Sequence, residues 1–528
     1  MYDLALVNGV VVDGSGAQPY TANVYVKDGR ISCITADPVM DADRVLDVTG
    51  RIVAPGFIDI HSHSDGAPLI DYLVESKIAQ GVTTEVTGNC GQSCMPATPE
   101  SVEILHRRMN QDLQLPLYGA KIGRMSVSDY ARDAEAAGIV TNFGNLIGHS
   151  ALRIAVMGLV DRAPTKDEME QLKALLKREL ERGAFGMSLG LNYPPSAFSK
   201  KEELVELAKV LKEYDATLSV HMRNEGPKVF EATDEMISIA EASGVHVQIS
   251  HLKLLGKPQW GRSEELLQKI EAARSRGLNI TCDQYPFTAS STSMTAVIPH
   301  WAQEGGYEAM LGRLRQPTEA LKAEIAGKVE ERGGAHTILV TSTNSVLPDC
   351  ESKFVSEIAD MFGLDPVDAI IKLLLDANSV VKCVYFCMDE ADMLNIMPRD
   401  FVCVGSDGYA FSYDSKYTPS NPHPRSFGTF PQFFQTVREK ELMPIEKAVH
   451  KVSGLPAQWL GLKDRGVLKE GYAADITVFD PQKIENLATY MNSKVRPKGI
   501  DYVIVNGRLA MDHGVLTAER AGKVLLHR

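Results

Sequence analysis

The sequence has 528 residues, 44% of them hydrophobic and 23% charged. This is enough apolar material for a large packed core, and it excludes a disordered or collagen-like chain. Acidic residues (68) outnumber basic ones (55), and no basic run could neutralise several phosphates, so the formal net charge of −13 argues against a nucleic-acid partner.

Both ends of the chain are rich in strand signals. Asn8-Gly9 lies between two apolar runs and is typical of a type I′ hairpin turn, and a second turn is predicted at Lys27-Asp28-Gly29. The same pattern returns around Asn506-Gly507. We therefore predict one small β-sandwich domain that is built from both termini, residues 1–56 and 464–528.

Between these ends, residues 57–463 alternate short apolar strands with amphipathic helices. Thr165 and Glu168 form a capping-box pattern that starts one helix, and Ser199 and Glu202 start another. Eight strands separated by helices predict an α/β fold, a closed (β/α)8 TIM barrel in which catalytic groups gather where the strands end. The predicted strands are 56–61, 81–86, 141–147, 184–189, 217–221, 245–251, 279–283 and 401–407.

The seventh and eighth predicted strands are separated by far more residues than one βα unit needs. We place an insertion at 288–346, where Pro and Gly interrupt helical stretches, and treat it as a candidate lid.

The strongest chemical signal is His61-Ser62-His63, which closes the first predicted strand. Side chains two residues apart on a strand point to the same side, so the two imidazoles face one point with the spacing of metal ligands. A pair of surface histidines is the alternative, but the apolar strand before them favours a metal site.

Three later strands also end in residues that bind metals. His221 and His251 close the fifth and sixth predicted strands, and Asp407 closes the eighth. Either histidine alone would more often be a core or rim residue. Four imidazoles at one barrel mouth, however, would be costly to bury with nothing to bind, and a carboxylate there can bind metal and also move protons.

This arrangement resembles the amidohydrolase superfamily, which has His-x-His after strand one, single histidines after strands five and six, and Asp after strand eight. The flanking segments 54–59 and 466–475 are similar too, and the resemblance covers essentially the whole chain. Many members carry a carboxylated lysine after strand four, but residues 183–189 contain no lysine.

Cys90, in Gly88-Asn89-Cys90-Gly91, follows the second strand instead. This position resembles the D-aminoacylase (N-acyl-D-amino-acid deacylase) family, in which the cysteine makes the metal bond that the lysine would otherwise make. A cysteine that is merely buried is the alternative, but a thiolate is a strong zinc ligand and the strand-end position favours ligation.

The resemblance implies zinc-dependent hydrolysis of N-acyl-D-amino acids to a carboxylate and a free D-amino acid. Zn²⁺ held by Cys90, His221 and His251 would bind the attacking water, and Asp407 would be the catalytic group that accepts its proton and returns it to the amine. The first histidine pair and Asp407 would form a second, weaker site, so we expect one tightly bound ion and leave the filling of the other open.

Further blocks resemble the same family and imply contacts with the substrate. The candidate substrate-binding residues are Lys253, Tyr285, Ser290, Arg425, Tyr193 and His149. By the resemblance, the first four would hold the α-carboxylate. The alternatives are solvated rim charges for Lys253 and Arg425, and a structural role at the barrel mouth for Tyr285 and Ser290.

The expected partner is a small-molecule N-acyl-D-amino acid. Relatives that act on acidic D-amino acids place a cation near the side-chain pocket, whereas residues 292–299 carry no charge, so we predict a preference for neutral, apolar side chains. Cleavage of a cyclic amide or of a dipeptide with a D-residue is one alternative. A catalytically silent scaffold is another, although it would predict eroded ligands.

The sequence also predicts where the protein works. No stretch approaches the roughly 20 apolar residues that cross a bilayer, and no basic leader precedes the first strand. The eight cysteines are spread thinly, unlike those of a disulfide-rich secreted scaffold. We therefore expect a cytoplasmic protein with no membrane contact, and leave open whether it forms a homo-oligomer.

Overall fold

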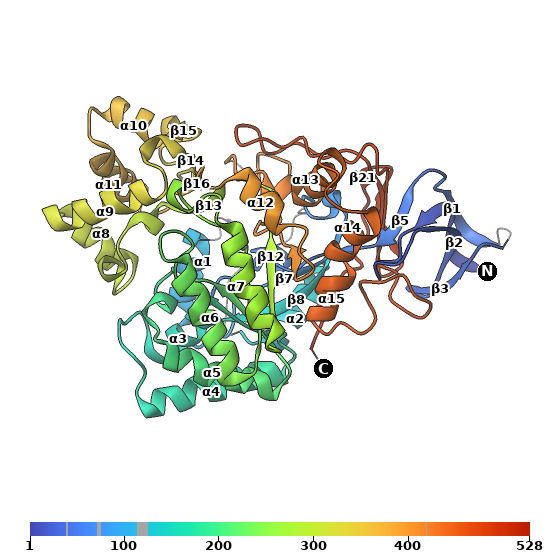
Figure 1. Ribbon diagram of the computed structural model, residues 1–528, viewed down its shortest axis with the longest axis horizontal. Helices are drawn as coiled ribbons and strands as arrows, with labels where there is room; N and C mark the ends of the chain where they lie inside the picture. The colour runs from blue at the N-terminus through green and yellow to red at the C-terminus, as the bar shows by residue number, and fades with distance from the viewer. Residues whose placement is uncertain (38–40, 71–74, 113–124, 419, 528) are drawn as a thin grey trace.

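The computed structural model describes residues 1–37, 41–70, 75–112, 125–418 and 420–527. Small parts of the predicted ranges 1–56, 57–463 and 464–528 therefore lie outside the described residues. Figure 1 shows three parts along the longest axis: a β-sheet at the end that carries the N-terminus, a barrel in the middle, and an α/β unit at the opposite end.

Eight parallel strands form the barrel sheet, in the order β17-β12-β11-β10-β9-β8-β7-β6. Almost all of their residues are buried, as expected for strands that are covered on both faces. All eight predicted strands are confirmed, with small shifts at their ends. They are β6 (Phe57–Asp59), β7 (Val82–Thr87), β8 (Asn142–Gly148), β9 (Gly186–Gly190), β10 (Thr217–His221), β11 (His246–Ile249), β12 (Ile280–Gln284) and β17 (Val402–Val404).

The barrel closes through the segments that follow its first and last strands. The backbone N–H of Asp407 donates to the carbonyl of His61, and that of His63 donates to the carbonyl of Gly408, each over 2.8 Å. These bonds join the two edges of the sheet and confirm the predicted TIM barrel. They also fix three predicted metal ligands against one another.

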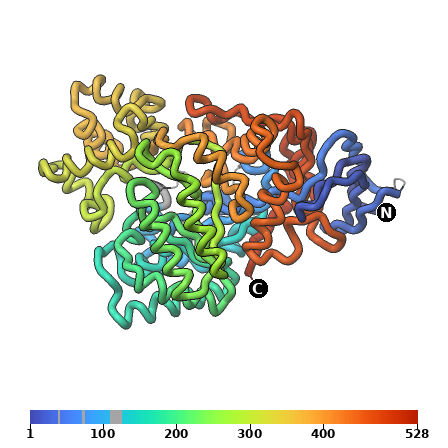
Figure 2. Tube along the Cα trace, viewed as in Figure 1, coloured from blue at the N-terminus to red at the C-terminus, as the bar shows by residue number. Residues whose placement is uncertain are grey.

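Helices follow the strands and cover the outside of the barrel, as the trace in Figure 2 shows. α4 (Lys166–Glu181) begins with the predicted capping box of Thr165 and Glu168. α5 (Lys201–Glu213) occurs where the second helix was predicted, but it has no side-chain cap, so the predicted capping by Ser199 and Glu202 is wrong. The Ser199 hydroxyl instead donates to the carbonyl of Ser196 over 2.6 Å, in the preceding turn. The other helices of this part are α1 (Val102–Asp112), α2 (Val127–Ala137), α3 (His149–Met157), α6 (Val229–Ser243), α7 (Ser263–Ser275), α12 (Glu390–Ile396), α13 (Arg425–Glu439), α14 (Ile445–Val452) and α15 (Gly454–Trp459).

The two chain ends share a nine-stranded sheet, in which β5 pairs antiparallel with β18 and Val53 lies opposite Val478. Figure 2 shows these N-terminal and C-terminal segments side by side. One apolar cluster contains side chains from both groups of strands, as the prediction of a common β domain requires. The strands are β1 (Tyr2–Val11), β2 (Tyr20–Lys27), β3 (Arg30–Thr35), β4 (Ala42–Asp47), β5 (Ile52–Pro55), β18 (Ile476–Phe479), β19 (Ile500–Val505), β20 (Arg508–Asp512) and β21 (Val515–Leu516).

The predicted hairpin at Asn8-Gly9 is wrong, because β1 runs through both residues. The pairing of β1 with β2 shifts register between Leu6 and Gly9, which marks a β-bulge. A Cβ atom on Gly9 would lie 2.5 Å from a methyl carbon of Val53, so glycine permits the close approach of β5. The predicted turns at Asp28-Gly29 and Asn506-Gly507 do occur, with positive φ at both residues of each pair.

A third sheet, in the order β13-β16-β14-β15, forms the α/β unit next to the barrel. Residues 288–346 supply only part of this unit, because the strand that lies between β13 and β14 is β16, which ends at Tyr385. The unit therefore extends past the predicted boundary. Its elements are β13 (Ser290–Ser293), α8 (Tyr307–Arg315), α9 (Glu319–Glu331), β14 (Ile338–Ser342), β15 (Lys353–Phe354), α10 (Val355–Phe362), α11 (Pro366–Asp376) and β16 (Lys382–Tyr385).

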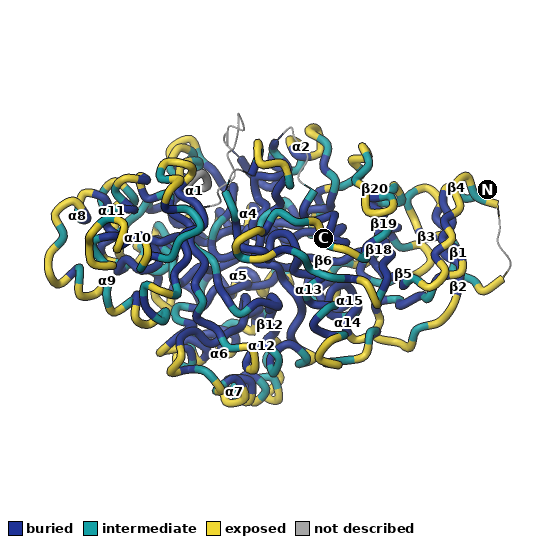
Figure 3. Tube along the Cα trace, turned by 90° about the horizontal axis from the view of Figure 1, so that it is seen from above, coloured by how far each residue is buried: buried dark blue, intermediate teal, exposed yellow. Residues whose placement is uncertain are grey.

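Buried residues concentrate in the barrel and along its contacts with the other two parts, while exposed residues mark the outer loops (Figure 3). Among the described helices, none combines the length and apolar character needed to cross a bilayer.

Candidate metal centre and substrate pocket

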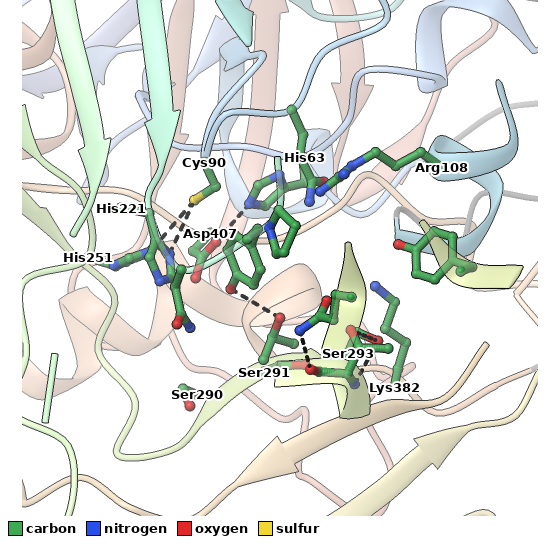
Figure 4. A pocket seen from close by; sticks show the side chains of 18 of the residues that line it. His63, Cys90, Arg108, His221, His251, Ser290, Ser291, Ser293, Lys382 and Asp407 are labelled. Carbon is green, nitrogen blue, oxygen red and sulfur yellow. Dashed lines mark hydrogen bonds and ion pairs between the residues drawn. The ribbon is translucent and has the colours of Figure 1, made fainter. Parts of the chain in front are cut away.

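Cys90 lies at the centre of a cluster of imidazoles at the carboxyl ends of the barrel strands (Figure 4). Its Sγ atom lies 3.3 Å from Nε2 of His61 and 3.6 Å from Nε2 of His251. Nδ1 of His221 lies 3.7 Å from the same sulfur. Zinc that is held tetrahedrally by a thiolate and an imidazole places their sulfur and nitrogen about 3.6 Å apart. The donor set and its spacing therefore fit a zinc ion.

The backbone around Cys90 is shaped to turn its sulfur into the barrel. Gly88 has φ of 81°, and a Cβ atom there would lie 2.0 Å from the carbonyl oxygen of Leu146, so only glycine fits. The side chain of Asn89 stabilises the turn, because its oxygen accepts a hydrogen bond from the Ser219 hydroxyl over 3.0 Å.

Three candidate ligands sit in the left-handed region of backbone space. Cys90, His251 and Asp407 have φ of 51°, 38° and 49°. Such conformations cost roughly 1–3 kcal/mol each in non-glycine residues and cluster at functional sites. The surrounding barrel must therefore hold these three residues in place.

Asp407 connects the histidine pair to the substrate side of the pocket. Its Oδ1 atom lies 3.0 Å from Nε2 of His63 and 3.4 Å from Nε2 of His61, and its Oδ2 atom lies 2.7 Å from the guanidinium of Arg425. Burial raises the pKa of Asp407, but the charge of Arg425 and the nearby imidazoles outweigh it and hold the pKa well below its usual range. The carboxylate is therefore ionised and can bind a cation or accept a proton.

The Cys90 thiol is also shifted towards its charged form. Burial raises its pKa, but His61 and the hydrogen bonds from His221 and His251 outweigh burial and place the pKa well below the usual range. Zinc binds the thiolate, so the sulfur is present in the form that a ligand requires.

Two carboxylates behind the histidines were not predicted as site residues. Oδ1 of Asp283 lies 3.0 Å from Nδ1 of His61, and Oε1 of Glu225 lies 2.9 Å from Nδ1 of His251. Carboxylates in this position commonly orient metal-binding imidazoles. Asp283 ends a predicted strand and could have been found by that signal, whereas Glu225 lies in a loop with no spacing rule to mark it.

The cluster opens into a cavity of about 330 Å³ that five of the six predicted substrate-binding residues line. Lys253 and Arg425 are only 4% and 3% exposed, so neither is a solvated rim charge. The ring of Tyr285 lies near both, with its centroid 5.9 Å from Lys253 Nζ and 5.0 Å from Arg425 Cζ. Lys253 Nζ also donates to Oε1 of Glu225 over 2.6 Å.

Tyr193 and Ser290 belong to the wall of the same cavity. The ring of Tyr193 lies 4.8 Å from the ring of His221, centroid to centroid, and its hydroxyl is 3.1 Å from Oγ1 of Thr292. Ser290 begins β13, the strand that also carries Thr292.

The structure does not bring His149 to the cavity. Its Nδ1 atom lies 2.8 Å from Oγ of Ser196 and its Nε2 atom lies 2.9 Å from Oε1 of Glu203. Arg153 donates to Oε2 of Glu203 over 2.6 Å, and all of these side chains are buried. His149 therefore joins α3 to α5 and is not placed to touch a substrate.

The rest of the cavity wall mixes apolar and cationic groups. Its apolar side chains are Ile104, Leu159, Phe198, Leu255 and Met310. Lys382 also lines the cavity, from β16, where it pairs with Ser293 of β13. The uncharged segment 292–299 thus faces a cation from a part of the chain that the sequence argument did not consider.

The chain matches the amidohydrolase family over residues 44–312 and 406–511. It is 33% identical to a D-aminoacylase of Alcaligenes xylosoxydans xylosoxydans over 525 residues, which cover 99% of this chain and 97% of the relative.

Solved structures agree with these relatives. An N-acyl-D-glutamate deacylase of Bordetella bronchiseptica, crystallised with zinc and a phosphonate that mimics the tetrahedral intermediate, matches with a TM-score of 0.82 at 31% identity over 99% of both chains. A D-aminoacylase with a binuclear metal centre, described as activated by one metal and attenuated by the second, matches with a TM-score of 0.82 at 33% identity over 100% of both chains.

We expect iodoacetamide to alkylate Cys90 in zinc-free protein already at pH 7, because the lowered pKa of Cys90 makes it a thiolate at that pH. Buried Cys94 should remain unlabelled, since burial and the charge of Asp65 raise its pKa well above the usual range. Both cysteines lie on one proteolytic peptide, so tandem mass spectrometry that assigns the label to Cys90 or Cys94 measures both rates between pH 7 and 9. Added zinc should protect Cys90. A Cys90 rate that rises tenfold per pH unit over this range would contradict the lowered pKa.

The Glu203→Gln variant should lower the free energy of unfolding by about 3–5 kcal/mol, because it leaves the buried Arg153 without a carboxylate. Urea unfolding followed by circular dichroism measures the change. Glu206→Gln, on the same helix but with a side chain that is 38% exposed, is the control and should cost about 1 kcal/mol or less. Equal losses in the two variants would contradict the role of the buried pair.

Proposed function

The chain belongs to the amidohydrolase family, within its D-aminoacylase branch, and we propose that it hydrolyses N-acyl-D-amino acids to a carboxylate and a free D-amino acid with zinc as cofactor. One observation carries the proposal: the ligand cluster around Cys90 and two buried cations, Lys253 and Arg425, line the same cavity. A linear substrate with an amide and a neighbouring carboxylate matches that pairing of chemistries.

The tight zinc site that we propose consists of Cys90, His221 and His251, which leaves a coordination position open, as a catalytic zinc requires. When bound, zinc supplies Lewis acidity that lowers the pKa of a water and polarises a carbonyl. A second, weaker site would use His61, His63 and Asp407. The relative with a binuclear centre supports two sites of unequal role.

Asp407 moves the proton in this proposal. Its ionised carboxylate accepts a proton from the attacking water and returns it to the nitrogen of the leaving amine. His63 and Arg425 hold its two oxygens from opposite sides, so the carboxylate does not need to reorient.

Lys253 and Arg425 would receive the α-carboxylate, beside the ring of Tyr285. The carbonyl would lie at the ligand cluster and the side chain against the apolar wall. If the carboxylate and the carbonyl stay in these positions, inverting the configuration at Cα moves the side chain away from the apolar wall. The pocket therefore favours one enantiomer.

The location of the enzyme is part of the same proposal. All eight cysteines, each within the described residues, are free thiols. This supports a cytoplasmic enzyme, because thiols remain reduced there.

A paired panel of D- and L-substrates, with zinc quantified in the same sample, tests the function. N-acetyl-D-methionine should be hydrolysed roughly 100-fold faster in kcat/KM than its L-enantiomer, and faster than N-acetyl-D-glutamate if the predicted apolar preference holds. A preference for the L-series would refute the substrate class. A higher kcat/KM for N-acetyl-D-glutamate would refute the apolar preference and point to the other cations that line the cavity, which are Lys382, Arg107, Arg108 and Arg332.

The same panel separates the alternatives. Faster cleavage of a hydantoin or of an L-Xaa-D-Xaa dipeptide would replace the proposed substrate. Wild-type protein that binds no zinc and cleaves none of these compounds would favour a non-catalytic scaffold.

The Asp407→Asn variant should lower kcat by about 10²–10⁴-fold, because the amide cannot accept the proton. Zinc at the tight site should remain, since Asp407 is not one of its three proposed ligands. Asp400→Asn, at a carboxylate that is 84% exposed, is the matched control and should retain full activity. An Asp407→Asn enzyme within tenfold of the wild type would contradict the assigned role.

A further inference from the structure

Glu225 lies between the proposed metal ligands and the proposed carboxylate clamp. It follows β10 by four residues, and its side chain is only 6% exposed. Its Oε1 atom accepts from Lys253 Nζ over 2.6 Å and lies 2.9 Å from Nδ1 of His251. Its Oε2 atom lies 3.6 Å from Nε2 of His221. One carboxylate therefore faces both histidines and the lysine.

In both rings, the nitrogen that faces Glu225 is opposite the nitrogen that faces Cys90. His251 turns Nδ1 to Glu225 and Nε2 to the sulfur, and His221 turns Nε2 to Glu225 and Nδ1 to the sulfur. A neutral imidazole carries hydrogen on one nitrogen and a lone pair on the other. Metal binding at the nitrogen near the sulfur therefore requires the hydrogen at the nitrogen near Glu225.

Lys253 competes with this arrangement. Its Nζ atom lies 2.7 Å from Nδ1 of His251. An ammonium has only donors, so a hydrogen bond from Lys253 to Nδ1 requires the ring hydrogen to lie on Nε2. His251 would then direct an N–H at Cys90 in place of a lone pair, and it could not bind metal.

We propose that Glu225 is the positioning residue that decides this competition: it accepts from Nδ1–H of His251, lies beside Nε2 of His221, and binds the Lys253 ammonium that would otherwise donate to the ring. Carboxylate acceptors behind a metal-binding imidazole fix its tautomer and orientation. A second claim, which rests on the proposed function, follows from the first. A substrate carboxylate that binds Lys253 removes the competing donor, so bound substrate raises the affinity for zinc. Bound zinc raises the affinity for substrate by the same factor.

Zinc titration against a chromophoric chelator tests the first claim without any measurement of activity. Glu225→Gln removes the negative charge and should weaken zinc binding by about 10–100-fold. Glu206→Gln makes the same chemical change at a half-buried glutamate on α5, which also accepts from lysines, Lys173 and Lys209. This variant should bind zinc as the wild type does.

The double variant Glu225→Gln/Lys253→Met distinguishes positioning from a general structural effect. With the competing ammonium gone, zinc affinity should recover at least fivefold relative to Glu225→Gln alone. A Glu225→Gln protein that binds zinc within twofold of the wild type, or a double variant that binds no better than the single one, would overturn the proposal.

Lys253→Met alone keeps the proposal open to refutation if Glu225→Gln does not fold. It should bind zinc at least as tightly as the wild type while KM for N-acetyl-D-methionine rises. Zinc binding more than tenfold weaker would overturn the proposal. If zinc-loaded wild type does not hydrolyse N-acetyl-D-methionine, the proposed function fails, whereas the zinc titrations still decide the role of Glu225.

Discussion

The burial of the ligand cluster is the constraint on which the rest of the structure depends. Four imidazoles, a thiol and a carboxylate lie together with almost no contact with solvent. Polar groups in such an environment need partners, and charges need opposite charges. The closed barrel provides these partners from strands far apart in sequence, and a cation at the centre would satisfy the remaining lone pairs.

The same constraint explains why the two clamp cations are themselves buried. Lys253 is neutralised by Glu225, and Arg425 is neutralised by Asp407. Each pair joins a residue of the proposed clamp to the metal cluster, Arg425 directly through Asp407 and Lys253 through Glu225, which contacts His251. The charge balance at the proposed clamp therefore depends on what is bound at the metal cluster, and the reverse holds too, although one binds the carboxylate and the other binds zinc.

The parts that the sequence predicted are those with a regular signal. Short apolar strands that end in His or Asp located the barrel and the cluster, because the carboxyl ends of parallel strands meet at one rim. Glu225 had no such signal, since its place depends on how the loop after β10 folds back. His149 shares a block with family members but turns towards Glu203, and only packing decides that direction. Asn8-Gly9 failed as a turn because β5 approaches β1 closely there, a contact between segments about 45 residues apart.

The pairing of β5 with β18 determines when, during synthesis, the ligand cluster can form. Val53 and Val478 are neighbours in the sheet but are separated by most of the polypeptide. During synthesis, the edge of β5 that pairs with β18 stays unpaired for tens of seconds. An unpaired strand edge can pair with other molecules. Only Gly56 separates β5 from β6, which carries the first histidine pair at its end. The ligand cluster is therefore completed late, after the ribosome has synthesised the C-terminal strands.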